Sequence, residues 1–361
     1  MIFYVMHTKM KAYKIWTFSL LVLLVIFIAA NYLIWKLYTE DILTFKPWHN
    51  GGLDRLGYIP GAKHYRKPES ILPKKHIDNV DYAGQHIDVL TIGDSFSNMD
   101  GNGRDPLYQD WIASTHGLEV LNIQQLNNMD SLTTLIVLLN SGYLDKIRPK
   151  HIIFESVERG ILYTYAKDID FTRTAPLDEI IKYYRTAKFG NESPPPFFIN
   201  NGNFKFLLYR LLYKVSDHAY NSVVYIRDLN IRAFSVPQYE NKLLFINADL
   251  QIIPLTTPEK IQLFNSNLNK LARLLRKKGM NLYFMPAADK YNIYSDYIID
   301  NPYPKSIFYE LLRNKPKAYI FVDTKTLLQE EVRKGEIDVY YADDTHWSWK
   351  GSKKIVEHMQ F

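Results

Sequence analysis

One stretch of this chain is so apolar that it can fold in few ways. Ile15–Trp35 comprises 21 residues without a charged side chain, between Lys14 and Lys36. About 20 such residues in a helix span the hydrocarbon core of a bilayer, where every backbone polar group must find its partner within the segment. We therefore expect residues 15–36 to form a transmembrane anchor. A signal peptide cleaved near Ala30 is the alternative, although its apolar core is typically only about 7–15 residues long.

The charged residues around this run predict its orientation. Residues 1–14 contain three lysines and no acid, whereas Glu40 and Asp41 follow shortly after the run. Lys and Arg are in excess on the cytoplasmic side of membrane-spanning helices. We expect residues 1–14 to form a cytoplasmic tail and everything after the anchor to lie outside the cytoplasmic membrane.

The rest of the chain divides into two parts. Residues 37–84 contain scattered prolines and show little periodicity, which is typical of a stalk and lead-in. From residue 85 to residue 361, patterns of strands and helices alternate, which predicts an α/β domain with a doubly wound, mostly parallel sheet and an insertion at about 160–250. Strands are expected at 87–92, 119–123, 151–154, 281–285, 318–322 and 337–341, and the clearest helices at 131–139, 204–215 and 257–279.

The composition fits a globular domain and excludes several classes of function. With 361 residues, of which 47% are hydrophobic and 23% charged, the chain can bury a full core. It contains no cysteine, which excludes disulfides and thiolate chemistry. The net charge of +6 comes without a basic stripe interleaved with aromatic residues, so we expect no nucleic-acid partner. No cluster of histidines and carboxylates has metal-ligand spacing, and we predict neither a metal nor another cofactor.

Two short polar motifs stand near opposite ends of the predicted domain. Residues 93–97, Gly-Asp-Ser-Phe-Ser, directly follow the first long strand, and residues 343–348, Asp-Asp-Thr-His-Trp-Ser, precede the last helix. A serine hydroxyl becomes a nucleophile when a histidine takes its proton and a carboxylate orients that histidine. Ligands of open α/β sheets bind at the carboxyl ends of the strands, so we expect Ser95 and His346 to meet there. Taken singly, the first motif could be a simple turn and the second a loop ion pair.

At these residues the chain resembles the SGNH hydrolase superfamily, and within it the extracytoplasmic polysaccharide O-acetyltransferases of the alginate and peptidoglycan types. The shared pieces are the Asp-x-His-Trp motif at Asp344–Trp347, a strand at 151–154 that leads to Glu155 and Arg159, and a Pro-x-x-Asp-Lys loop that ends at Lys290. Ser95 precedes the Asp-x-His motif, which is the order of the peptidoglycan-type enzymes. The resemblance covers roughly residues 85–160 and 257–361.

This resemblance implies roles for particular residues. Ser95, His346 and Asp344 would form a catalytic triad, with Asp343 as the alternative acid because many SGNH enzymes place it three residues before the histidine. The superfamily's usual glycine and asparagine oxyanion donors have no clear match here, which leaves the Ser95 backbone N–H as one donor. The further candidates for oxyanion or substrate binding are Gln125, Asn127, Arg159, Lys290 and Trp347. For Arg159 and Lys290 a structural ion pair is an equal alternative.

The resemblance also implies a function and a location. We expect a single-pass protein of the bacterial cell membrane, with a periplasmic or extracellular domain that moves an acetyl group through Ser95 onto hydroxyls of a cell-surface or exported polysaccharide. A multi-pass membrane-bound O-acyltransferase would be the partner that supplies the acetyl group. An acetylesterase with the same triad and an assembly subunit of a polymer-acylation machinery are the alternatives. Aromatic residues of the insertion, among them Tyr163, Tyr165, Tyr184 and Phe197, would either stack on sugars or form its own small core.

Overall fold

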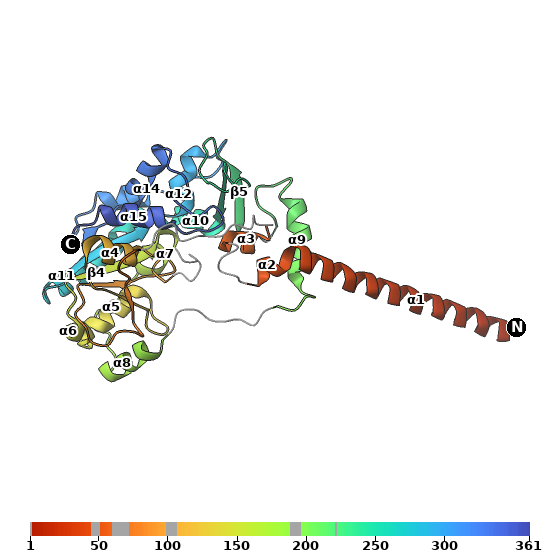
Figure 1. Ribbon diagram of the computed structural model, residues 1–361, viewed down its shortest axis with the longest axis horizontal. Coiled ribbons are helices and arrows are strands. Elements are labelled where there is room, and N and C mark those ends of the chain that lie inside the picture. Colours follow the sequence, from red (N-terminus) through yellow and green to blue (C-terminus); the bar gives the residue numbers. More distant parts are fainter. Residues whose placement is uncertain (1, 45–50, 60–71, 99–106, 188–195, 221) are drawn as a thin grey trace.

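The structure, a computed structural model, describes residues 2–44, 51–59, 72–98, 107–187, 196–220 and 222–361. A long helix, α1 (Ile2–Ile34), projects from one side of an α/β domain, and the C-terminus lies on the opposite side of that domain (Figure 1). The domain therefore begins where α1 ends.

A six-stranded parallel sheet forms the centre of the domain. Its strand order is β1-β3-β2-β4-β7-β8, and every neighbouring pair runs parallel. The bounds are β1 Ile77–Asp78, β2 Val89–Ile92, β3 Val120–Ile123, β4 His151–Val157, β7 Asn281–Ala287 and β8 Ile320–Phe321. All residues of β2 and β3 are buried, as expected of strands that are covered by helices on both faces. The predicted α/β class with a doubly wound parallel sheet is confirmed.

The order of the strands locates the place where a ligand should bind. From β2 the chain first moves outward to β3 and then crosses back to β4 on the other side of β2. In doubly wound sheets the crevice lies at the carboxyl ends of the strands where this direction reverses, which here means β2 and β4. The residues directly after β2 are the motif that contains Ser95.

The helices flank the sheet and follow local signals in the sequence. In α11 (Pro258–Arg276), the Thr257 side chain caps the first turn by accepting from Lys260 N, and Pro258 occupies the first helical position. Its apolar face is buried in the core. The other helices of the domain are α4 Tyr108–His116, α5 Ser131–Asn140, α6 Tyr143–Ile147, α7 Glu158–Tyr165, α8 Leu177–Thr186, α9 Asn201–Leu212, α10 Asn247–Gln251, α12 Lys290–Tyr294, α13 Phe308–Arg313, α14 Thr324–Arg333 and α15 Trp349–Glu357.

The predicted insertion contains a separate small sheet. Strands β5 (Val224–Asp228) and β6 (Lys242–Ile246) pair antiparallel. Of the aromatic residues proposed for sugar stacking, Tyr165 and Tyr184 are buried in the main core, whereas Tyr163 is exposed. Tyr165 and Tyr184 therefore pack into the core of the whole domain and not into a separate small core of the insertion.

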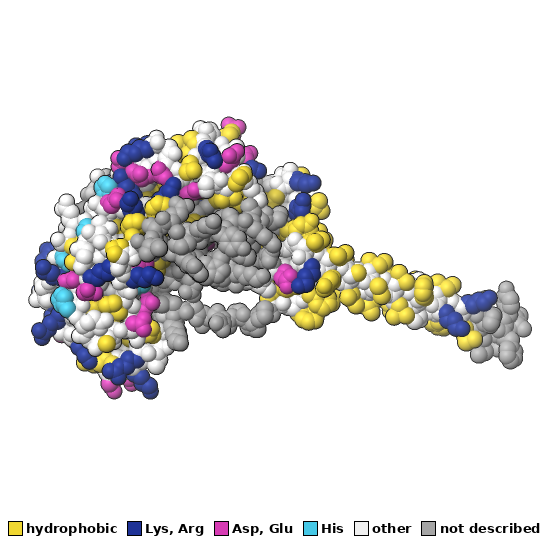
Figure 2. Space-filling view, viewed as in Figure 1, with side chains coloured by type: hydrophobic (Ala, Val, Ile, Leu, Met, Phe, Trp, Pro, Cys, Tyr) yellow, Lys and Arg dark blue, Asp and Glu magenta, His cyan; other side chains and the backbone are white. Residues whose placement is uncertain are grey.

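The amino-terminal helix has the properties of a membrane span. Helix α1 continues into a π-helical turn at Trp35–Thr39 and into α2 (Glu40–Leu43). Residues Met10–Thr39 are long and apolar enough to cross a membrane, and none of their most apolar window is buried against the protein. Figure 2 shows this projecting rod covered with hydrophobic side chains. Among the described residues no other helix is long and apolar enough to cross a membrane. The one possible span thus coincides with the segment that the sequence predicts.

The expected stalk and lead-in, residues 37–84, contains a helix that the sequence does not predict. Gly52–Gly57 forms a short helix, α3, with the Leu53 side chain completely buried in the core. Residues 37–84 were expected to be a stalk, but this part of them packs into the domain next to the Asp343 segment, where Leu53 N donates to Asp343 O at 2.9 Å.

One expected strand is wrong. Residues 337–341 form no strand; within them only Tyr340 makes an isolated bridge, to Trp347. Asp338 has a φ of 59°, and this left-handed conformation breaks an extended strand. The Asp338 backbone and carboxylate bind Ala233 O and Ser235 N instead of a sheet neighbour. The segment therefore serves as the base of the loop that carries His346.

Candidate active site

The turn after β2 places Ser95 at the surface. Gly93 leaves the strand so close to its neighbours that a Cβ atom there would lie 2.2 Å from both Glu155 Oε2 and Ser97 Oγ. Only glycine fits this approach, since real contacts of that kind do not occur below about 3 Å. Two positions later the Ser95 side chain is exposed. The turn therefore holds the serine outward over a tightly packed base.

Asp94 and Glu155 tie this turn to β4. Asp94 Oδ2 accepts from Val157 N at 2.6 Å, and its Oδ1 accepts from Phe96 N at 3.2 Å. Glu155 Oε2 accepts from Asp94 N at 3.1 Å and from Ser97 Oγ at 2.8 Å. Burial and then the nearby charge of Asp94 raise the pKa of Glu155 well above its usual range. These bonds fix the backbone on both sides of Ser95.

The loop before α15 brings His346 to the same place. Its backbone folds back on itself, with Tyr341 N donating to His346 O at 3.1 Å and Ser348 N donating to Val339 O at 3.0 Å. The ring of Phe96, next to Ser95, lies 4.4 Å from the His346 ring and 4.6 Å from the Trp347 ring, measured between centroids. The two motifs therefore pack directly against each other.

Three side chains form a continuous chain of hydrogen bonds. Ser95 Oγ lies 2.8 Å from His346 Nε2, and His346 Nδ1 lies 2.6 Å from Asp344 Oδ1. Because the carboxylate favours a proton on Nδ1, it leaves Nε2 as the acceptor for the serine proton. The arrangement can activate a serine nucleophile and carry the proton it releases. The structure thus brings together the three predicted residues, whose catalytic roles stay a prediction.

The two neighbouring acids of the loop occupy different positions. Asp344 Oδ2 accepts from Gly52 N at 3.0 Å while its other oxygen faces His346. Asp343 is completely buried, and its Oδ2 accepts from Gly51 N at 2.6 Å. By geometry Asp344 is the acid that partners His346, whereas Asp343 holds Gly51, directly before α3, against the loop.

Lys290 and Arg159 are held by internal partners. The completely buried Lys290 Nζ donates to Tyr341 O and Ala342 O, at 2.8 Å in both cases. Burial lowers the pKa of Lys290 to about 7, against the opposing effect of nearby acids. Arg159 Nη1 donates to Asp289 Oδ1 at 2.6 Å. These contacts favour the structural alternative for both cations, with Lys290 supporting the backbone that leads into the Asp343 and Asp344 pair.

The other predicted residues are placed differently from one another. Gln125 Nε2 donates to Gly93 O at 3.4 Å and to Ser131 Oγ at 2.8 Å, so its amide lies beside the serine turn. Asn127 is exposed in the turn that follows β3. Trp347 is buried against Phe96 and therefore supports the loop instead of meeting a substrate.

Sequence reasoning missed three groups around this site. They are Gly51 and Gly52, which donate to the two acids, Phe96, which joins the motifs, and Tyr108, whose hydroxyl lies 2.9 Å from Ser97 Oγ. The paired glycines just before an apolar residue were the one signal available for the first group.

A comparison with known protein families finds a match to part of the chain. Residues 244–357 match the family model described as the SGNH hydrolase-like domain of the acetyltransferase AlgX. The matched segment runs from β6 to α15 and contains Lys290, Asp344 and His346. The match confirms the predicted resemblance to SGNH O-acetyltransferases. No curated protein matches the chain.

Proposed function

We propose that this protein is an O-acetyltransferase that moves an acetyl group through Ser95 onto hydroxyl groups of a cell-surface or exported polysaccharide. The observation that carries the proposal is the hydrogen-bonded chain from Ser95 through His346 to Asp344. These three side chains lie at the switch point of the sheet. Residues 244–357 of the protein also match an acetyltransferase family model.

In the first half of the reaction the serine takes the acetyl group. Ser95 Oγ attacks the carbonyl carbon of the donor ester while His346 Nε2 accepts the hydroxyl proton. The bond from Oγ to the acetyl carbon forms, and the bond to the donor oxygen breaks. The departing oxygen takes the proton from Nε2, and Asp344 stabilises the positive charge on the imidazole while it lasts.

In the second half a sugar hydroxyl takes the place of the donor. It transfers its proton to His346 Nε2 and attacks the acetyl carbon, the bond to Ser95 Oγ breaks, and Oγ regains the proton. The backbone N–H of Ser95 is the donor we assign to the transient oxyanion. Each half reaction returns His346 to its neutral form, and the second half restores the Ser95 hydroxyl, so the complete cycle requires no cofactor.

The location of the site outside the cytoplasmic membrane belongs to the same proposal. The segment before the apolar run of α1 carries Lys9, Lys11 and Lys14, and Glu40 follows that run. A polysaccharide outside the cell and an acetyl donor from a multi-pass membrane-bound O-acyltransferase would then both reach the domain. A reporter fused after residue 361 should be active only outside the cytoplasm, and cytoplasmic activity would contradict this part.

Transfer and hydrolysis differ in how they respond to an acceptor. The full-length protein in lipid nanodiscs is given an activated acetyl ester, with and without a panel of wall and capsule oligosaccharides. A sugar hydroxyl that is bound beside His346 has a far higher effective concentration at the acetyl-serine than a free hydroxyl in solution, and it therefore outcompetes water. A matching acceptor should speed up turnover and become acetylated.

The control is the variant His346→Ala, with which the acetyl group should be transferred neither to an acceptor nor to water. If no oligosaccharide in the panel accelerates turnover while acetylated polymer is hydrolysed, the protein is an acetylesterase and the transferase proposal is wrong.

A further inference from the structure

Helix α9 is attached to the end of the membrane-spanning helix. Asn203 Nδ2 donates to Asn31 Oδ1 at 2.9 Å, and Thr39 Oγ1 donates to Asn203 Oδ1 at 2.5 Å. The Tyr38 ring stacks on Phe206 with 4.8 Å between centroids. The buried residues of α9 share this side of the helix; they are Gly202, Asn203, Phe206 and Tyr209. One face of α9 is thus fixed to the stretch where α1 leaves its apolar span.

The opposite face of α9 is apolar and exposed. Phe204, Leu207 and Leu211 follow the spacing of one helical stripe and are 69%, 47% and 63% exposed. At about 100° per residue this stripe lies opposite the buried face, and Lys205 and Arg210 lie on its two flanks. The helix itself contains no acidic residue. An apolar stripe with basic flanks is the pattern of a helix that lies in a membrane interface.

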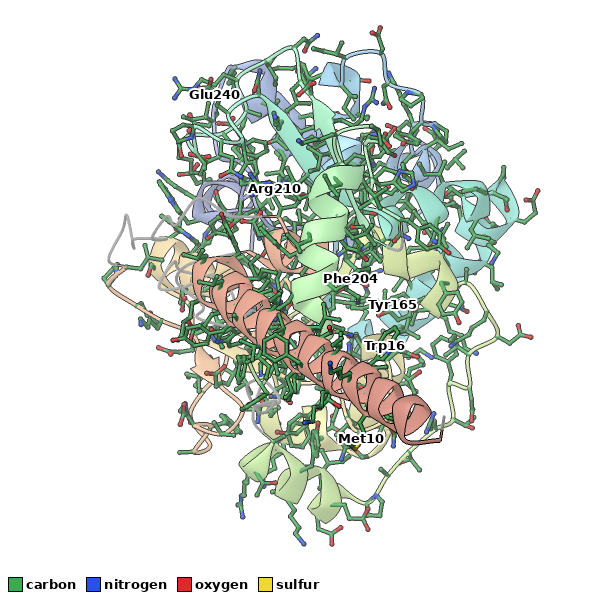
Figure 3. The ribbon with its side chains drawn as sticks, turned by 90° about the vertical axis from the view of Figure 1, so that its right-hand side faces the viewer. Met10, Trp16, Tyr165, Phe204, Arg210 and Glu240 are labelled. Carbon is green, nitrogen blue, oxygen red and sulfur yellow. The ribbon has the colours of Figure 1, made fainter. Side chains whose placement is uncertain are left out.

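The arrangement of the two helices fits that position. In Figure 1, α9 runs across the direction of α1 at the point where α1 meets the domain. Figure 3 views the molecule from the side on which α1 projects, and α9, with Phe204 and Arg210 labelled, lies in front of the domain in this view. If α1 crosses a bilayer, α9 therefore lies along the bilayer surface on the domain's side.

We propose that α9 is an interfacial helix, which inserts Phe204, Leu207 and Leu211 between the lipids around α1 and binds anionic phospholipid headgroups through Lys205 and Arg210. The contacts at Asn203 and Phe206 hold α9 beside the end of the apolar span of α1, so the lipid that surrounds α1 is the occupant within reach of the exposed stripe. The helix would hold the domain directly on the membrane instead of at the end of a free stalk. This inference depends on the insertion of α1 and is independent of acetyl transfer.

A depth measurement tests this inference. The chain contains no cysteine, so single fluorescent labels can be attached after Leu207→Cys or, as a control, after Ile320→Cys in β8. The two side chains are 47% and 44% exposed, which makes them a matched pair. Each full-length variant is placed in nanodiscs of phosphatidylcholine and phosphatidylglycerol that carry a doxyl quencher either near the headgroup or near the end of the acyl chain.

The interfacial position predicts a specific pattern. Interfacial helices sit roughly 5–10 Å deep, so the shallow quencher should act about threefold or more strongly on the label at position 207 than on the label at position 320. The deep quencher should act less strongly on position 207 than the shallow one. Arg210→Gln combined with Lys205→Gln should reduce quenching at position 207 in nanodiscs that contain phosphatidylglycerol.

Three results would overturn the inference. Equal, weak quenching at both positions would mean that α9 does not touch lipid. If the label at position 207 is shielded only when a membrane protein partner is added, the exposed stripe of α9 is a protein-docking surface. Unchanged quenching after removal of the two basic residues would contradict the headgroup contact. None of these outcomes depends on whether Ser95 transfers acetyl groups.

Discussion

Gly51→Ala should damage the active site without touching the triad. A Cβ atom at Gly51 would lie 2.0 Å from Asp343 O and 2.6 Å from Asp343 Cγ. These gaps are more than about 1 Å short of van der Waals contact, so the Asp343 and Asp344 loop must move away from α3. Asp344 would then lose its alignment with His346 Nδ1, since Gly52 N holds its second oxygen.

The size of the effect follows from this displacement. A misplacement of about 1 Å in a catalytic group costs on the order of 10²-fold in rate, and loss of the orienting carboxylate altogether costs on the order of 10⁴-fold. We therefore expect kcat to fall by about 10²-fold. Overpacking of this kind should also lower the free energy of unfolding by about 1–3 kcal/mol.

Gly52→Ala is the matched control for this variant. A Cβ at Gly52 meets Asp344 Oδ2 at 3.6 Å, which is an ordinary contact, and its backbone N–H is kept. Turnover of an activated acetyl ester and thermal unfolding are measured for both full-length variants. If Gly51→Ala is as active as Gly52→Ala, the close packing of Gly51 against Asp343 does not position the acid.

Three further outcomes are expected. Ser95→Ala and His346→Ala should each abolish acetyl-ester turnover, and the double variant should lose little more in steady-state assays, because the two residues act as a unit. Asp344→Asn should lower kcat more than Asp343→Asn; the reverse order would make Asp343 the acid. Burial would lower the pKa of His76, but its carboxylate partners outweigh this and raise it to about 9, so His76 stabilises the fold below pH 6.5 and this contribution fades toward pH 9. The free energy of unfolding, measured with urea, should fall between pH 6.5 and pH 9, and His76→Gln should remove this part of the fall.

The features that sequence predicted correctly have local signals. Strand β4 contains the apolar run Ile152–Phe154, and α11 combines a threonine cap, a proline at its first position and a regular apolar face. Ser95 and His346 stand in short motifs whose residue types already suggest their chemistry. Because Ser95 directly follows a parallel strand, its place at the ligand-binding edge of the sheet could be predicted, whereas His346 follows no strand and reaches that edge through its loop.

Long-range contacts explain most of what sequence could not predict. The bonds from Gly51 and Gly52 to the two acids join residues 292 positions apart, and no local pattern reports such a pairing. The expected strand at 337–341 has a suitable composition, but the left-handed Asp338 and its contacts to the insertion override that preference. Lys290 belongs to a sequence motif, but its carbonyl partners lie about 50 residues further along the chain and no local pattern predicts them.

Ser95 should carry the acetyl group between the two half reactions, and peptide mass spectrometry can detect this ester. The full-length protein is mixed with an activated acetyl donor, quenched with acid within the first turnovers and digested. We expect an acetyl ester on the peptide that contains Ser95, none after Ser95→Ala, and loss of the ester when an accepted oligosaccharide is added. Donor consumption without acetyl-Ser95, or an acetyl ester on another residue that persists after Ser95→Ala, would contradict this expectation.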